Sequence, residues 1–276
     1  MNKEPLLYTK SFIGQNNPQC FVSNISNGSV VMCTACSPVN LTMNQDASAL
    51  LPIGLDSSVF VLADGAGGMR GGSQASSLVI EILSDSINKA VEVQADLRDA
   101  ILNGIEQANL AIMALGIGAG STISVVEQNG MTIRSYHVGD SDVIVMGQRG
   151  RLKHHTIAHS PVGYAIEAGL LDENEALHHN ERHLISNILG SNDMHIAIGP
   201  TIELAENDTV LLASDGLTDN LSIDAIIDIV RIGKLSSSVR KLFKHTLEHM
   251  KNPPDLAASK ADDLTIIAFR PKPFRK

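Results

Sequence analysis

The sequence predicts an α+β fold in which antiparallel sheets are covered by helices. Strand-like segments outnumber helical segments and come in hairpins, most clearly where Asn129-Gly130 joins two apolar runs. The helical segments come in pairs instead of alternating with single strands, which disfavours a doubly wound parallel sheet. No repeat, low-complexity tract or linker divides the 276 residues, so we expect one domain.

In the first half of the chain, strands precede two helices. Residues 1–28 are rich in Asn, Ser and Gln, and we expect an extension or an edge element there. Segments 29–37 and 58–64 are β-branched or continuously apolar, as in buried strands. A loop with five glycines at 65–72 leads into a helix with apolar residues at 3.6-residue spacing, and Asp96 is the expected N-cap of a second helix.

The second half begins with strands and then mixes short helices with strands. We expect strands at 121–127, 131–138, 142–146, 195–198, 209–213 and 264–269. We expect helix starts at Ser160-Pro161, at Asp172 with a capping box to Glu175, and at Ser222, and a further helix at 238–250.

Composition limits the classes of function. A formal net charge of −9 disfavours nucleic-acid partners, because binding to phosphates requires a basic face. No apolar run reaches the ~20 residues that a membrane span needs, and the first residues lack the apolar centre of a signal peptide. We therefore expect a cytoplasmic protein without nucleic-acid or membrane partners.

Cysteine and histidine do not predict a zinc site. Three cysteines are too few for a disulfide scaffold. Cys33 and Cys36 form a C-x-x-C, but residues three apart on a strand point to opposite faces, so we expect two small core residues. Six of the ten histidines lie between 154 and 183 without metal-ligand spacing, and we expect surface or capping roles for them.

Five aspartates lie at strand ends or in tight loops, most of them beside glycine. They are Asp46, Asp64, Asp140, Asp215 and Asp262. A strand holds a side chain rigidly at its end, and glycine lets the backbone fold closely around an ion. Converging carboxylates repel one another unless a hard cation lies among them, and oxygen ligands suit Mg²⁺ or Mn²⁺. The alternative for each aspartate is a turn cap.

Short motifs occur in a fixed order between about residues 29 and 270. They include NQDA at 44–47, VLADGAGG at 61–68, GST at 120–122, HVGDS at 137–141, SDGL at 214–217 and DDLT at 262–265. Together they resemble the bacterial-type members of the metal-dependent Ser/Thr protein phosphatases, the type 2C or PPM family. The resemblance implies a four-layer αββα sandwich of two antiparallel β-sheets flanked by helix pairs. It also implies a single phosphatase domain at 29–270, with a flap at about 157–190 and a tail at 271–276.

The resemblance also implies a centre of two Mn²⁺ or Mg²⁺ ions at one end of the sandwich. Asp64 matches the aspartate that bridges both ions, and the carbonyl of Gly65 matches a ligand of the first. Asp215 and Asp262 match the ligands of the second ion. Asp140, with Asp215, matches the site of a third and weaker ion.

The implied reaction is hydrolysis of phospho-Ser and phospho-Thr in proteins by a hydroxide that bridges the metal ions. Asp46 matches the acid that orients metal-bound water. The implied partners are a phosphoprotein and a cognate Ser/Thr kinase, and we expect a monomer. Many members carry an arginine where Leu41 stands, and Arg70 is the nearest candidate for the phosphate contact. Some members carry a histidine where Ala66 stands, so another group or water must protonate the leaving group.

Two other functions stay open at this point. The same fold can serve as a catalytically weak regulatory binding module, although no metal aspartate of the family is missing. Alternatively, the chain is a phosphatase for a small phosphorylated molecule, because Leu41 implies a different phosphate contact.

Overall fold

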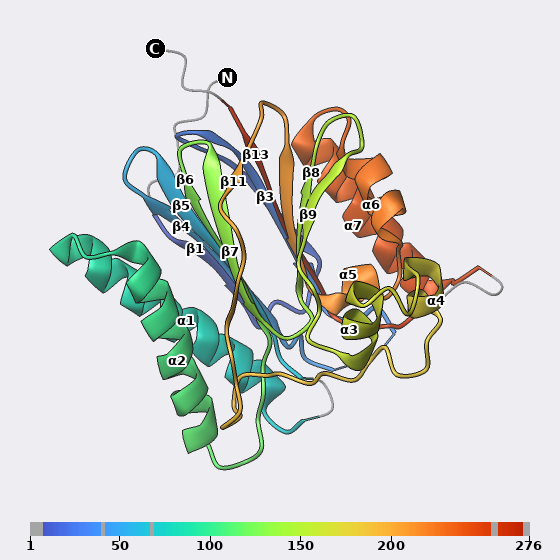
Figure 1. Ribbon diagram of the computed structural model, residues 1–276, viewed down its shortest axis with the longest axis horizontal. Coiled ribbons are helices and arrows are strands. Elements are labelled where there is room, and N and C mark those ends of the chain that lie inside the picture. The colour runs from blue at the N-terminus through green and yellow to red at the C-terminus, as the bar shows by residue number, and fades with distance from the viewer. Residues whose placement is uncertain (1–7, 40–41, 67–68, 255–258, 273–276) are drawn as a thin grey trace.

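Two antiparallel sheets pack face to face, and a pair of helices covers each outer face (Figure 1). The computed structural model describes residues 8–39, 42–66, 69–254 and 259–272. The sequence-based prediction of a four-layer αββα sandwich is confirmed. Its three interfaces are apolar: one core lies between the sheets, and one lies between each sheet and its helices.

The first sheet has the strand order β1-β4-β5-β6-β7-β10, and β11 also pairs with β7. Its strands are β1 (Lys10–Ile13), β4 (Asp46–Ile53), β5 (Ser57–Asp64), β6 (Ile123–Asn129), β7 (Thr132–Val138), β10 (Ala197–Ile198) and β11 (Ile202–Glu203). The predicted hairpin between β6 and β7 is confirmed, and its two turn residues are Gly130 and Met131, because Asn129 pairs with Thr132. Gly130 has a φ of +57°.

The second sheet has the strand order β2-β3-β13-β12-β8-β9. Its strands are β2 (Gln19–Ile25), β3 (Gly28–Ala35), β13 (Leu264–Pro271), β12 (Thr209–Ala213), β8 (Asp142–Met146) and β9 (Leu152–His155). Residues 10–25 therefore contribute an edge strand to each sheet.

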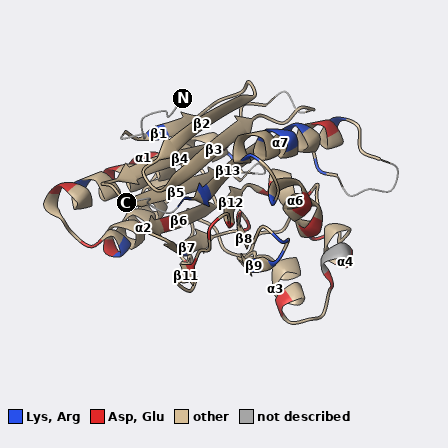
Figure 2. Ribbon diagram, turned by 90° about the horizontal axis from the view of Figure 1, so that it is seen from above, with Lys and Arg blue, Asp and Glu red and all other residues tan. Residues whose placement is uncertain are grey.

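Two helix pairs close the sandwich. The first pair is α1 (Gly72–Val93) and α2 (Leu97–Ala114), and the second is α6 (Ile223–Val230) and α7 (Leu235–Lys251). The predicted N-caps of α2 and α6 are confirmed, since Asp96 accepts from the Asp99 N–H and Ser222 from the Ala225 N–H. Basic residues line the outer face of α7 (Figure 2). None of the described helices is long and apolar enough to cross a membrane.

Short helices follow β9 and β12 at the lower end of the sandwich in Figure 1. They are α3 (Pro161–Glu167), α4 (Glu173–Leu177) and α5 (Asp215–Thr218). Ser160 caps α3, and Asp172 forms the predicted capping box with Glu175 at the start of α4. The segment from 157 to 190 returns to the first sheet through a bridge between Leu189 and Ser121.

The expectation for Cys33 and Cys36 needs correction. Cys33 is buried, but it is disulfide-bonded to Cys20, its register partner on β2. Cys36 is only partly buried, and its thiol donates to the Asn16 carbonyl at 2.9 Å. The disulfide depends on the pairing of β2 with β3, and the composition of residues 1–28 indicates no register that would reveal it.

Candidate metal centre

Strand ends and one short helix bring the predicted aspartates to the same end of the sandwich. Asp64 ends β5 and is the register partner of Asp46, which begins β4. Asp215 begins α5 directly after β12, and Asp262 lies just before β13. A cavity of about 570 Å³ is lined by Asp64, Asp215, Asp262 and Asp140, with Asp46 buried nearby.

The turn after Asp64 is built on close backbone contacts. The Asp64 carbonyl accepts from the Thr122 N–H at 2.8 Å and from the Ser121 hydroxyl at 2.9 Å, which fixes the end of β5. A Cβ at Gly65 would lie 2.3 Å from the carbonyl carbon of Gly72 at the start of α1. Only glycine therefore lets the start of α1 approach the turn after Asp64 so closely.

Buried carboxylate oxygens without protein partners face this region. Asp46 Oδ2 accepts from the Ser214 hydroxyl at 2.8 Å, whereas Asp46 Oδ1 and Asp140 Oδ1 are buried without a hydrogen-bond partner among the described residues. Burial, and then the charge of Asp263, raises the pKa of Asp46 well above its usual value. A metal ion or its bound water is the kind of partner that satisfies such oxygens.

The carboxylates raise one another's pKa values. For Asp64, burial is the main cause, followed by the charges of Asp46 and Asp215. Burial and the charge of Asp215 likewise raise the pKa of Asp140 and of Asp262. This mutual repulsion is what a cation in the cluster would relieve.

Asp262 and Asp263 are neighbours with different surroundings. The two carboxylate oxygens of Asp263 accept from the backbone N–H groups of Ser37 at 2.8 Å and Gln45 at 2.6 Å. Asp263 therefore ties the start of β13 to the residues just after β3 and just before β4. Both residues line the cavity, but Asp262 Oδ1 accepts from the N–H of the adjacent Asp263 at 2.9 Å, a bond that ties no distant segment.

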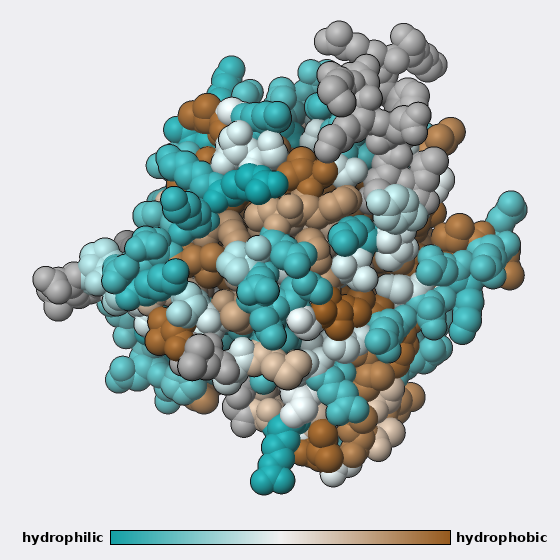
Figure 3. Space-filling model, turned by 180° about the vertical axis from the view of Figure 1, so that it is seen from behind, coloured by the Kyte–Doolittle hydropathy of each residue, from teal (hydrophilic) through white to brown (hydrophobic). Residues whose placement is uncertain are grey.

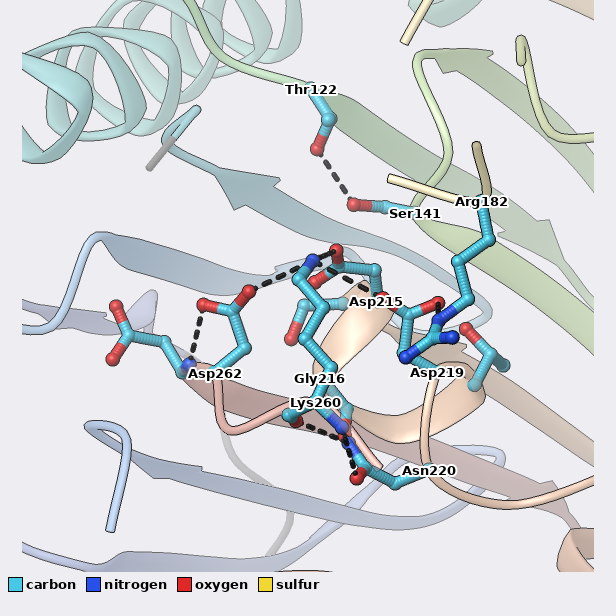
Figure 4. A network of polar contacts seen from close by, with 12 residues as sticks. Thr122, Ser141, Arg182, Asp215, Gly216, Asp219, Asn220, Lys260 and Asp262 are labelled. Carbon is cyan, nitrogen blue, oxygen red and sulfur yellow. Dashed lines mark hydrogen bonds and ion pairs between the residues drawn. The ribbon is translucent and has the colours of Figure 1, made fainter. Parts of the chain in front are cut away.

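A lysine that the sequence analysis did not single out lies among the carboxylates (Figure 4). Lys260 Nζ is 2.5 Å from Asp215 Oδ2, 3.0 Å from Asp262 Oδ2 and 3.1 Å from Asp219 Oδ2. Burial alone would lower the pKa of Lys260, but the charges of Asp215, Asp219 and Asp262 outweigh it and raise the pKa. Burial and the charge of Asp215 raise the pKa of Asp219 to about 7.

The sequence contains only weak indications that Asp219 and Lys260 belong to this site. Asp219 follows Asp215 by four residues, the spacing that places side chains on one face of a helix. Lys260 precedes Asp262 by two residues, but nothing in that spacing indicates where a flexible side chain points.

The donor set of the cluster fits a hard divalent cation. The cluster consists of carboxylates, and its buried oxygens without a hydrogen-bond partner include those of Asp46 and Asp140. Within the described part of the chain, however, no three His, Cys, Asp or Glu side chains are already arranged to hold a metal ion. The ammonium of Lys260 lies between the carboxylates that would have to converge.

The structure does not bring Arg70 into the cavity. Its side chain is exposed, although the neighbouring Met69 lines the cavity wall. Ala66 also lines the cavity and offers no proton donor. Leu41, the position of the absent arginine, lies outside the described residues.

The expected surface role holds for His178 and His183 but is wrong for His159, which is buried. His159 Nδ1 accepts from the Gly139 N–H at 3.1 Å, and the His159 N–H donates to the Gly139 carbonyl at 2.9 Å. This pair joins the start of the 157–190 segment to the turn that carries Asp140. The sequence could not indicate this buried role, because both contacts join residues that are 20 positions apart in the chain.

Comparisons with known proteins agree with this arrangement. The sequence pattern of the family described as protein phosphatase 2C matches residues 39–258. Protein phosphatase PhpP of Streptococcus pneumoniae is 31% identical over 180 residues, which cover 63% of this chain and 72% of that protein. The Ser/Thr phosphatase structure of S. agalactiae has a TM-score of 0.72 at 27% identity and covers 88% of this chain and 99% of that one.

A third likeness bears on the fold alone. The catalytic domain of the Ser/Thr protein phosphatase PstP, solved in complex with two manganese ions, has a TM-score of 0.69 at 23% identity. The match covers 88% of this chain and 97% of that one.

Proposed function

This chain belongs to the protein phosphatase 2C family, and we propose that it hydrolyses phospho-Ser and phospho-Thr in proteins in a metal-dependent reaction. The observation that carries the proposal is the meeting of Asp64, Asp140, Asp215 and Asp262 around one open cavity. Structural neighbours named as Ser/Thr phosphatases support the substrate class.

We propose that Asp64, the Gly65 carbonyl, Asp215 and Asp262 hold two Mn²⁺ or Mg²⁺ ions, and that Asp140 joins Asp215 at a third, weaker site. Oxygen-only donors and the orphaned oxygen of Asp140 support these assignments. The PstP domain, which shares this fold, was solved with two manganese ions. When bound, such ions activate water and neutralise phosphoryl charge.

The chain's own residues then position the reactants. Asp46 is held in place by the Ser214 hydroxyl, and its free oxygen, Oδ1, can accept a hydrogen bond from the attacking water and orient it. Apolar side chains of Met69, Ile185 and Ile188 form part of the cavity wall and limit access of bulk water. The leaving oxygen takes its proton from water or another group, because Ala66 offers none.

We also propose a cognate Ser/Thr kinase as functional partner, a monomeric state and a cytoplasmic location. A phosphoprotein substrate requires a kinase and its ATP, which is held inside cells. On the face shown in Figure 3, hydrophobic residues are interspersed with polar ones. In a reducing compartment the Cys20–Cys33 pair should be found as thiols, which thiol labelling in intact cells would test.

A metal-dependent assay tests the function. Asp64→Ala and Asp215→Ala should each lower kcat on phosphopeptides by at least about 10²–10³, as expected for loss of a key electrostatic group. The exposed Asp228→Ala is the matched control and should keep its rate. Circular dichroism should show an intact fold in all three variants.

The substrate distinguishes the alternatives. Activity on p-nitrophenyl phosphate and small phosphate esters but not on phosphopeptides would favour a small-molecule phosphatase. Hydrolysis that persists without any divalent metal ion, or no hydrolysis at all, would contradict the proposal, and the second result would favour a binding module.

A further inference from the structure

Lys260 carries a positive charge at the point where the proposed second metal ion would bind. Its Nζ lies 2.5 Å from Asp215 Oδ2 and 3.0 Å from Asp262 Oδ2, and both are among the proposed ligands of that ion (Figure 4). A divalent cation such as Mg²⁺ binds carboxylate oxygens at about 2.0–2.1 Å. An ammonium bonded to the same oxygens would then lie against the ion, and two positive charges at that distance repel each other strongly.

Hydrogen bonds to Asn220 hold the backbone of Lys260 in place. The side chain of Asn220, which is 3% exposed, accepts from the Lys260 N–H at 3.0 Å and donates to the Lys260 carbonyl at 2.8 Å. The same amide donates to the Gly216 carbonyl at 3.0 Å, so the clamp is anchored on α5. These hydrogen bonds favour a movement of the lysine side chain, and not of its backbone, when the ammonium separates from the carboxylates.

The side chain has room and a second partner. It is 30% exposed and forms part of the cavity wall. Asp219 Oδ2 lies 3.1 Å from Nζ and is not among the proposed metal ligands. Rotation of the flexible stem can thus release Asp215 and Asp262 without leaving the ammonium unpaired.

We propose that Lys260 is an intramolecular cation that occupies the second metal position and is displaced from Asp215 and Asp262 when the metal ion binds. Metal binding is then an exchange of one cation for another. Lys260 acts as a positioning residue: it neutralises the carboxylates of the metal-free protein and lowers the affinity of the site for the ion. The proposal rests on the proposed metal centre.

The first test measures metal affinity directly. Lys260→Met keeps the apolar stem and removes the charge, so the EDTA-treated variant should bind Mn²⁺ about tenfold or more tightly in titration calorimetry. Lys153→Met is the matched control: Lys153 is 26% exposed and pairs with Asp208, outside the cavity lining. Its Mn²⁺ affinity should equal that of the wild type.

Thermal unfolding of the same proteins gives an independent readout. Without metal, Lys260→Met should have a lower Tm than the wild type, because Asp215, Asp219 and Asp262 lose their common counter-charge. The rise in Tm on adding Mn²⁺ should be larger in Lys260→Met than in the wild type, since tighter binding stabilises the fold more.

The second test uses the wild-type protein and does not depend on a variant folding. Reductive methylation followed by mass spectrometry measures how available each lysine amine is. Methylation of Lys260 should become several-fold faster when Mg²⁺ is added, because the ammonium leaves two of its three carboxylates. Methylation of Lys153 should not change.

The outcomes distinguish a failure of the Lys260 exchange from a failure of the proposed metal centre. Equal Mn²⁺ affinity in Lys260→Met and the wild type, or a Lys260 methylation rate unaffected by Mg²⁺, would overturn the exchange and leave the metal centre intact. Failure of the wild-type protein to bind Mn²⁺ at all would overturn both the metal centre and the exchange.

Discussion

At the scale of single residues, the hydrogen-bond partners of an aspartate beside the cavity decide whether it contributes to stability or to catalysis. Asp263 holds two backbone N–H groups, so Asp263→Asn should lower the free energy of unfolding by about 1–3 kcal/mol. Asp262 lines the same cavity and pairs with Lys260 at 3.0 Å, so Asp262→Asn should lose less stability than Asp263→Asn but lose about 10² or more in kcat. Urea unfolding and steady-state kinetics of the two variants check this contrast. The same loss of stability in both would show that Asp262 is structural.

The contact with the substrate phosphate is a second prediction at this scale. A guanidinium can hold two phosphate oxygens, and Arg70 directly follows the cavity-lining Met69. If the loop brings Arg70 to the substrate, Arg70→Ala should raise KM for phosphopeptides more than it lowers kcat, because the phosphate is charged in both ground and transition states. Unchanged constants at saturating metal would show that the exposed Arg70 stays in solvent.

At the scale of elements, the 157–190 segment is tied to the Asp140 turn through His159. Burial, with the nearby charges of His137 and His195, lowers the pKa of His159 to about 4 from the ordinary 6.5. The folded protein therefore resists protonation of His159 that the unfolded chain accepts. The contribution of neutral His159 to the free energy of unfolding is fully present above about pH 6.5 and is lost as the pH falls toward 4.

His159→Asn removes the titrating imidazole but keeps an oxygen that can accept from the Gly139 N–H. It therefore separates the pH-dependent contribution of His159 from its hydrogen bond. Between about pH 7 and about pH 4.5, the variant should lose less stability in urea unfolding than the wild type does. The raised pKa values of the acid cluster are common to both proteins and cancel in the comparison. Parallel pH profiles would rule out the contribution of His159.

Strand β4, which lies second from the edge of the first sheet, also depends on its neighbours. The segment of β4 contains Asp46, Pro52 and alanines, which are poor strand formers, and the sequence analysis did not predict it as a strand. Pairing with β5 along its whole length makes it one, and Pro52 lies beyond the part that β1 pairs with.

At the scale of the whole molecule, metal binding should couple activity to stability. Exhaustive EDTA treatment should abolish hydrolysis, and Mn²⁺ or Mg²⁺ should restore it and raise the Tm by mass action. The rise in Tm should shrink in Asp64→Ala, which lacks the proposed bridging ligand. Full activity after exhaustive chelation would contradict the two-metal proposal.

The domain boundaries also concern the whole molecule. We propose that residues 29–270 form one phosphatase domain. Residues 10–25 add an edge strand to each of its sheets, and the family pattern matches 39–258.

Features that depend on a few neighbouring residues could be predicted from the amino-acid sequence alone. The Asn129-Gly130 hairpin and the caps at Asp96, Ser160, Asp172 and Ser222 need only local backbone geometry, and all are present. The ordered Asp-Gly motifs likewise indicate the family and the candidate ligands, because each motif is a short run of adjacent residues.

The meeting of distant side chains depends on the tertiary fold. The Cys20–Cys33 disulfide needs the register of β2 on β3, and the buried role of His159 needs the turn at Gly139. Lys260 reaches Asp215 across 45 residues, because Asn220 clamps its backbone to α5. Such contacts depend on how separate elements pack in space, and the spacing of residues along the chain carries no record of that packing.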